Sequence, residues 1–594
     1  SGVSWPISGV TLSSDVSGLT LGKDIGSTAH TDTVTMASTT SIAGPINVYA
    51  GTINVNANLM SGATTGTGIL LKASGDVTMA SGVDITTQGS KQVYWSDSDV
   101  SGAGAIVSGN ASTNYGLFTT NGGDIVMGGG AGTTLPMGSA YGLQAVNLVY
   151  ATLNTGAGDI TMRGISNGTL NYGIGVRFFN NVSLTGRNIT LVGTGSSNTG
   201  SNLGNWGVGL EVASITGSGL TSITGTGGGS ASTGADNHGV LVAGSTITGT
   251  GSGAMTITGT GGGKSGAGIN NDGVNVSGGS TVKSASGTLT LIGTAGLNGS
   301  SEGIAVQANA GTTNTLGDAS SQIGGITLRA NSMYFNPTNT NLVLGTGTLA
   351  LEPLTANTSI GVGTGSGTLS LAAGLFSGAS RVFGDGFSSI TIGSNNAGNM
   401  TVGGALSFTD STTLLTNGNI TINSASSVTN SQAGANMVLA ATGNFINNAG
   451  AGAITTTDAG ANDRWIVYSN TPTSNTFGSL NSANTPVWGK SIATLAPSGV
   501  DPGNRYVFAS NPSVVVGTTS ANKIYGNTLD VSSFYGISGA VSSNAYIDLT
   551  LSDVYTTLPT VTSSGAANTA VVGSYSVNAS GGVVKPGYTV TYNN

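Results

Sequence analysis

The 594-residue chain contains no cysteine, so it can form neither a disulfide nor a thiolate metal site. Its two histidines, His30 and His238, are too few for an ordinary imidazole zinc site. Lysine and arginine together number 15 against 23 acidic residues, which leaves a net charge of −8. Because binding to phosphates needs a stripe of positive charge, this shortage argues against a nucleic-acid partner.

Further absences narrow the fold class. No apolar run approaches the roughly 20 residues that span a bilayer. Proline is scarce, at 12 residues, and glycine has no three-residue period, which excludes collagen. Charged residues make up only 6% of the chain and hydrophobic residues 38%, a composition unlike that of disordered proteins. The chain is instead rich in glycine, with 101 residues.

The glycines mark an internal repeat. Gly-Thr pairs recur at spacings of 32, 34 and 34, and they begin at Gly193, Gly225, Gly259 and Gly293. A second marker, glycine followed by Ile or Val, runs in phase with the first, at Gly173, Gly207, Gly239, Gly273 and Gly303. A fixed period of short strands and Gly-rich turns, with no helical pattern between them, predicts a solenoid.

The strands themselves show period-two alternation. In Gly75–Met79, for example, Val77 and Met79 share one face and Thr78 lies on the other. After Gly325 the glycine spacing tightens to 22 and 20, close to the roughly 20 residues of a bare coil. The longer middle period therefore predicts inserted loops, on the stretches Gly195–Asn205, Gly227–Asn237 and Gly261–Asn271.

These patterns predict an all-β chain whose main part is a right-handed parallel β-helix over residues 1–455, with loop-decorated coils around 170–310. One hydrophobic residue recurs at the same position of four successive coils. These residues, expected to stack as an interior ladder, are Leu191, Ile223, Ile257 and Leu291.

Two further regions follow the predicted helix. Aromatics and prolines cluster in 456–511, which we expect to be a capping segment and connector because a solenoid end must be covered. Its cap residues are Trp465, Tyr468 and Trp488. Residues 512–594 predict a small antiparallel, Ig-like β-sandwich. Its expected strands include Lys523–Gly526, Ala545–Leu549, Gly573–Val577 and Gly587–Tyr592.

A family resemblance rests on the order of several segments, namely Gly44–Gly51, Ile69–Thr78, Val93–Ile106 and Arg464–Ser469. They resemble the filamentous-haemagglutinin-type large exoproteins that Gram-negative bacteria export by two-partner secretion. Ala521–Gly526 is similar to the MBG/YDG-type repeat of such adhesins. The resemblance implies export through an outer-membrane transporter and an extracellular or cell-surface location. No N-terminal secretion domain is recognisable, which suggests a piece of a longer polypeptide.

Candidate chemistry is sparse. Paired acids such as Asp97 and Asp99 could serve a polysaccharide-cleaving β-helix or bind calcium, but an Asp before a strand more often caps a turn. His238 occupies a position that other coils fill with Tyr, Trp, Asp or Glu, which predicts a tolerant surface site. We therefore expect no catalytic, cofactor-binding or metal-binding residues, no cofactor and no enzymatic activity.

The expected function is that of a secreted structural adhesin. It would attach cells to hosts, surfaces or one another, or assemble head to tail with copies of itself into an extracellular matrix filament. Expected assembly contacts are Trp5, Tyr588 and Tyr592, because solenoid ends present unpaired strand edges. The alternative is a β-helix that binds or cleaves a polysaccharide.

Overall fold

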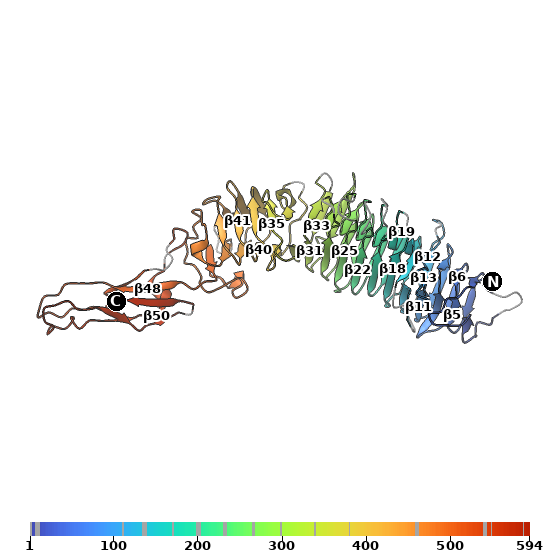
Figure 1. The fold of residues 1–594 in the computed structure, drawn as a ribbon, viewed down its shortest axis with the longest axis horizontal. Coiled ribbons are helices and arrows are strands. Elements are labelled where there is room, and N and C mark those ends of the chain that lie inside the picture. Colours follow the sequence, from blue (N-terminus) through green and yellow to red (C-terminus); the bar gives the residue numbers. More distant parts are fainter. Residues whose placement is uncertain are drawn as a thin grey trace. The chain divides into compact units, whose positions relative to one another are not determined.

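A computed structural model gives the fold of the chain (Figure 1). It describes residues 3–5, 12–109, 112–132, 139–168, 171–197, 203–229, 234–263, 268–297, 300–337, 340–378, 381–457, 463–538, 543–547, 549–585 and 587–594. These residues form two compact units, Ser1–Thr355 with Gly374–Ser389, and Ala356–Ala373 with Ile390–Asn594. The expected all-β class is confirmed, since the chain is nearly all β with long parallel sheets.

The first unit contains two large sheets whose strand ladders run parallel. One sheet consists of β1 (Val3–Trp5), β3 (Thr33–Met36), β4 (Thr40–Ile42), β6 (Thr52–Val55), β7 (Leu59–Ser61), β9 (Val77–Met79), β10 (Asp84–Thr87), β12 (Ile106–Ser108), β13 (Gly116–Thr119), β16 (Gln144–Val149), β17 (Ala151–Asn154), β19 (Ile174–Gly186), β21 (Val208–Gly217), β23 (Val240–Ala243), β24 (Thr246–Gly249), β26 (Val274–Ser277), β27 (Thr281–Ser284), β29 (Ile304–Gln307), β30 (Thr313–Gly317), β32 (Met333–Phe335) and β33 (Thr340–Leu344).

The strands of the other sheet in this unit are β2 (Leu19–Leu21), β5 (Ile46–Ala50), β8 (Thr67–Ala73), β11 (Lys91–Trp95), β14 (Ile125–Gly128), β15 (Ala140–Gly142), β18 (Ile160–Ser166), β20 (Ile189–Thr194), β22 (Thr221–Thr226), β25 (Met255–Thr260), β28 (Leu289–Thr294), β31 (Ile326–Ala330) and β34 (Thr348–Glu352). Figure 1 shows the strands stacked one behind the next along the unit.

The strands pair in the register of the sequence repeat. Ile257 of β25 lies opposite Ile223 of β22 on one side and Leu291 of β28 on the other. Leu191 of β20 continues this row beyond Ile223. All four side chains are fully buried, while Thr256 and Thr258, which flank Ile257 on β25, are half-buried on the opposite face of the strand. Aliphatic residues at one position of each coil therefore bury one another, and no coil could bury its row alone.

The two glycine markers meet where one sheet gives way to the other. A Cβ placed on Gly259 would lie well inside 3.0 Å of the carbonyl oxygen of Gly273, and the same holds for Gly225 against Gly239. Gly193 and Gly293 face Gly207 and Gly303 in the same way. The repeat carries glycine at both positions because two backbones touch there and no side chain fits.

The expected inserted loops lie only partly within the described residues. The described parts of Gly195–Asn205, Gly227–Asn237 and Gly261–Asn271 contain no strand. Residues 198–202, 230–233 and 264–267 of these stretches lie outside the described residues. The prediction of loops around 170–310 stays a prediction for those positions.

The second unit also contains parallel sheets. Their strands are β35 (Ile360–Gly363), β36 (Leu369–Leu371), β38 (Met400–Gly403), β41 (Ile420–Ile422) and β44 (Phe445–Asn447); β39 (Ala405–Phe408), β42 (Ser427–Asn430) and β45 (Ile454–Thr456); and β37 (Ser389–Ser394), β40 (Thr412–Thr416), β43 (Met437–Ala441), β46 (Trp465–Ser469) and β47 (Arg505–Phe508). Three short 3₁₀ helices are described, η1 (Ala373–Leu375), η2 (Pro472–Ser474) and η3 (Pro497–Gly499).

The aromatic segment expected as a cap contributes two strands to this parallel sheet. β46 pairs with β43, Trp465 lying opposite Met437, and β47 pairs with β46, Val507 lying opposite Tyr468. The side chains of Trp465, Tyr468 and Trp488 are all buried. The ring centroids of Trp465 and Tyr506 are 5.1 Å apart. The parallel sheet therefore continues past the predicted boundary at residue 455, and the role of these aromatics as a cap stays a prediction.

The tail of the second unit differs from the expected antiparallel sandwich. Its elements are β48 (Ser513–Thr518), β49 (Tyr535–Ser538), α1 (Leu551–Val554), β50 (Tyr555–Thr557), β51 (Thr560–Thr562), β52 (Asn578–Ser580), β53 (Val583–Val584) and β54 (Thr589–Asn593). β48 pairs antiparallel with β49 but parallel with β54, so the first and last strands of the tail run in the same direction. β50–β53 and β51–β52 are short antiparallel pairs.

Three of the four expected tail strands are wrong. Lys523–Gly526 and Gly573–Val577 form no ladder, and only the last expected strand is present, as β54. In Ala545–Leu549 the described residues form no strand, and Tyr546 packs into the aromatic cluster instead, 5.8 Å from Phe508 between ring centroids. Alternation of apolar and polar residues describes a half-buried extended segment, but a strand also needs a partner for its backbone.

Candidate functional site

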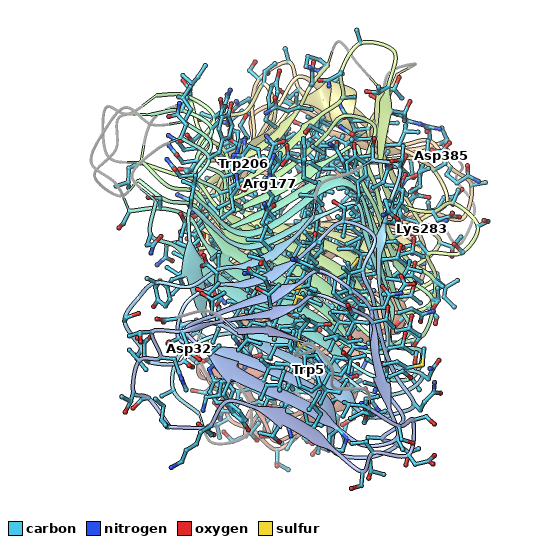
Figure 2. The ribbon with its side chains drawn as sticks, turned by 90° about the vertical axis from the view of Figure 1, so that its right-hand side faces the viewer. Trp5, Asp32, Arg177, Trp206, Lys283 and Asp385 are labelled. Carbon is cyan, nitrogen blue, oxygen red and sulfur yellow. The ribbon has the colours of Figure 1, made fainter. Side chains whose placement is uncertain are left out.

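A column of polar and aromatic side chains runs along the first unit, directly before the second glycine marker of successive coils. Its members are Tyr172, Trp206, His238, Asp272 and Glu302. Backbone bonds hold the coils in register at this level, since the N–H of Gly207 donates to the oxygen of His238 at 3.1 Å, and that of Gly239 to Asp272 at 2.9 Å. Figure 2 labels Trp206, near the start of the column.

The expectation that this position is a surface site is wrong. Tyr172 is 50% exposed, but Trp206, His238 and Asp272 are 8%, 5% and 1% exposed. The Trp206 Nε1–H donates to the backbone oxygen of Asp236 at 2.7 Å, and its ring meets that of Tyr172 edge to face. The side chains of Trp206, His238 and Asp272 are covered by their neighbours in the stack, so variation in residue type here does not mean exposure to water.

Beside the column lies a buried ladder of asparagines that sequence reasoning missed. The Asn205 side-chain amide donates to Asn237 Oδ1 at 2.9 Å, and that of Asn237 donates to Asn271 Oδ1 at 3.1 Å. The same oxygens also accept the backbone N–H groups of Asn205 and Asn237. The backbone N–H of Asn271 donates in turn to Ser301 Oγ at 2.8 Å. The sequence signal that could have revealed this ladder is the asparagine two residues before Gly207, Gly239 and Gly273.

His238 and Asp272 form the titratable centre of the column. His238 Nδ1 lies 3.5 Å from Asp272 Oδ2, and it accepts the backbone N–H of Asp272 at 3.4 Å. Nδ1 is therefore unprotonated and the ring is neutral. The Asp272 carboxyl accepts from the Asn275 amide at 2.8 Å and from the backbone N–H of Glu302 at 2.9 Å.

Burial displaces the pKa values of His238, Asp272 and Glu302. Loss of hydration lowers the pKa of His238 to about 4, against a weaker opposing effect of the Asp236 charge. Burial raises the pKa of Asp272, partly offset by its hydrogen bonds from Glu302 and Asn275. Burial likewise raises the pKa of Glu302. Each shift favours the neutral form of its group, as expected for ionisable groups withdrawn from water.

The lowered pKa of His238 predicts an acid-sensitive contribution to stability. The unfolded histidine takes up a proton near pH 6.5 and the folded one only near 4, so the contribution is present above pH 6.5 and is lost as the pH falls between these values. The stability of the protein relative to a His238→Gln variant should fall by about 2 kcal/mol from pH 7 to pH 5. Denaturant unfolding of both proteins at the two pH values measures this difference.

The comparison with His238→Gln isolates the histidine. The raised pKa values of Asp272 and Glu302 act with the opposite sign, because they favour the folded state as the pH falls, but both acids remain in the variant. A difference between the two proteins that does not change with pH would show that folding leaves the pKa of His238 at its unfolded value.

The acids considered from the sequence are separate from this column. Asp97 is fully buried, and its Oδ1 accepts from Ser101 Oγ at 3.0 Å and from the N–H of Gly102 at 2.9 Å, so it organises a turn. Another acid that directly precedes a strand, Asp159 before β18, pairs with Arg187, with 2.8 Å between Oδ1 and Nε. Among the residues that the structure describes, no group of three or more His, Asp or Glu side chains is placed to hold a metal ion.

The residues expected at assembly contacts are not freely exposed. The Trp5 side chain is buried in β1, whose strand pairs with β3. Tyr588 and Tyr592 are half-buried, and the Tyr592 hydroxyl donates to the backbone oxygen of Gly581. Only a local rearrangement would offer the Trp5 ring to a second copy.

Comparison with known proteins identifies no relative: no family model, no curated protein and no solved structure matches the chain. In the described part of the chain, no helix has both the length and the apolar character needed to cross a membrane.

Proposed function

We propose that this chain is a secreted structural adhesin of a Gram-negative bacterium, of the filamentous-haemagglutinin type. In this proposal, the parallel sheets are those of a right-handed β-helix, closed by the aromatic segment and followed by an Ig-like, MBG-like tail. The observation that carries it is the in-register stacking of aliphatic, asparagine and glycine rows through successive coils. Such a stack presents an extended surface, which suits attachment and assembly better than turnover of a small substrate.

The surface charges support this proposal. Several cations pair with an acid of a neighbouring coil: Arg177 Nε lies 2.8 Å from Glu211 Oε2, and Lys283 Nζ lies 3.0 Å from Asp318 Oδ2. Figure 2 labels Arg177 and Lys283 on the first unit. These ion pairs lie partly buried at the surface, and the two charges of each pair neutralise one another. They favour a surface that binds by many neutral polar contacts over one that steers charged ligands.

The proposal is tested by attachment and by imaging. Beads coated with the purified chain should adhere to bacterial or host-cell layers under flow and resist salt, and electron microscopy of the concentrated protein should show end-to-end assemblies. Beads coated with heat-unfolded protein serve as the control. Adhesion no greater than that of the control, together with strictly monomeric particles at high concentration, would contradict the proposal.

The second candidate is a polysaccharide-cleaving β-helix, favoured by the meeting of His238, Asp272 and Glu302 in adjacent coils. General acid–base chemistry needs such a set within reach of a substrate. The burial of His238 and Asp272 weighs against it. Incubation with pectin, alginate and neutral glucans should release no new reducing ends or unsaturated products. Release that is lost in both His238→Gln and Asp272→Asn would make the chain an enzyme.

A further inference from the structure

The tail of the second unit holds a cavity of about 520 Å³, and two segments that make no strand ladder line much of it. They are 520–526 and 563–577. A volume between about 300 and 1,000 Å³ is typical of sites for small molecules. Loops held on a β scaffold are also where recognition sites concentrate, because the scaffold fixes the loop ends while the loops vary.

Hydrogen bonds join and order these two segments. The Lys523 ammonium donates to the backbone oxygen of Ala567, and the N–H of Leu529 donates to Ala566 at 3.0 Å. The Tyr575 hydroxyl donates to the oxygen of Val571 at 2.8 Å. A Cβ on Gly565 would lie within 3.0 Å of the Tyr575 ring, so the ring rests on bare backbone. The walls of the cavity are therefore held by specific contacts.

The lining combines aromatic faces with neutral hydrogen-bonding groups. Tyr525 and Tyr575 are 66% and 38% exposed and supply two rings. Asn522, Ser520 and Ser574 supply an amide and hydroxyls. Among the lining residues that the structure describes there is no carboxylate, and the one cation, Lys523, is engaged with the neighbouring segment. Tyr, Ser, Gly and Asn on loops are also the residues that antibody paratopes use, because tyrosine gives rigid amphipathic contact area and the others adaptable hydrogen bonds.

We propose that this cavity binds a neutral saccharide. The ring faces of Tyr525 and Tyr575 suit the apolar face of a pyranose, while the amide and hydroxyls suit its hydroxyl groups. The absence of free charge in the lining disfavours sulfated, sialylated or phosphorylated ligands. The rim also exposes Val571 and Val572, which would suit an apolar peptide, but the volume of the cavity and the amide and hydroxyl groups of its lining favour the sugar. The saccharide site adds a class of ligand to the adhesive function proposed above. Its biological role rests on that function, whereas saccharide binding itself does not depend on it.

Binding is tested with the full chain on an array of neutral oligosaccharides built from glucose, galactose, mannose and N-acetylglucosamine, with sialylated and sulfated glycans as charged comparators. Isothermal titration calorimetry then measures the dissociation constant of the best neutral probe. Tyr525→Ala should weaken binding about tenfold or more, which corresponds to about 1.4 kcal/mol. Tyr525→Phe keeps the ring and should stay close to the parent protein. Leu558→Ala changes a side chain that is 52% exposed and outside the cavity lining, and should have no effect.

Three results would overturn the saccharide site: no neutral glycan bound above background, a preference for charged glycans, or equal binding by Tyr525→Ala with an unchanged circular dichroism spectrum. Selection of apolar peptides from a displayed library, with binding lost in Val572→Ser, would assign the cavity to a protein partner instead. Flow adhesion of beads coated with the parent protein separates the two proposals, because adhesion by a chain that binds no neutral glycan leaves the adhesive function standing while the saccharide site fails.

Discussion

Replacing Ile257 with Asp is expected to destabilise the first unit by about 3–5 kcal/mol, because it places an unpaired carboxylate inside a stacked apolar row. Ile257 is fully buried between Ile223 and Leu291, which lie opposite it in the neighbouring strands. The acid would lose its hydration there without gaining a cation. Denaturant unfolding followed by circular dichroism measures the change.

A matched control lies on the same strand. Thr260 ends β25 with an exposed side chain, so Thr260→Asp adds the same charge in water and should change stability by less than about 0.5 kcal/mol. Equal stability of Ile257→Asp and the parent protein would show that this row does not face the core.

Replacing Gly259 with Ala is expected to cost about 3 kcal/mol, even though it adds a single methyl group. The new Cβ would overlap the carbonyl oxygen of Gly273, which is held in place because it accepts the backbone N–H of Val240 at 2.9 Å. Backbone cannot swing away as a flexible side chain does, so the two sheets must separate locally. The midpoint of thermal unfolding, compared at equal protein concentration, should fall accordingly.

Gly374→Ala is the matched control, since a Cβ at Gly374 meets nothing within 4 Å. It should be neutral or slightly stabilising, because alanine lowers the entropy of the unfolded chain. If Gly259→Ala unfolds at the same midpoint as Gly374→Ala, the close approach of the two glycine rows is absent in solution.

Both predictions concern the same physical property of this chain. Each coil of about 34 residues contributes one residue to every stacked row. A substitution in one coil therefore removes contacts from the coils on both sides of it. Ile257 and Gly259 are two residues apart on β25, one in the aliphatic row and one in the glycine row. The double variant therefore should not show additive losses, because the two sites share neighbours.

The sequence showed that the residues of the candidate site hold equivalent positions of a repeat, but it did not show that they meet in a buried site. The glycine that follows His238 and Asp272 placed both in equivalent positions of neighbouring coils. Their burial, the neutral state of His238 and the asparagine ladder beside them depend on what the next coil presents at 3 to 4 Å. Sequence variation at one position suggested tolerance, whereas the stack accommodates different side chains by pairing them with each other.

The sequence by itself determined the all-β class, the coil period and the positions where apolar side chains and bare backbone recur. The period can be recognised in the sequence because each coil repeats the same local requirements. These are alternation of apolar and polar residues in the strands and glycine where no Cβ fits. Only the tertiary structure decided that β46 and β47 extend the parallel sheet, that β48 and β54 run parallel, and that three expected tail strands form no ladder. The physical reason is that a strand is completed by a partner far away in the chain, and local alternation carries no information about which segment that partner is or whether one is within reach.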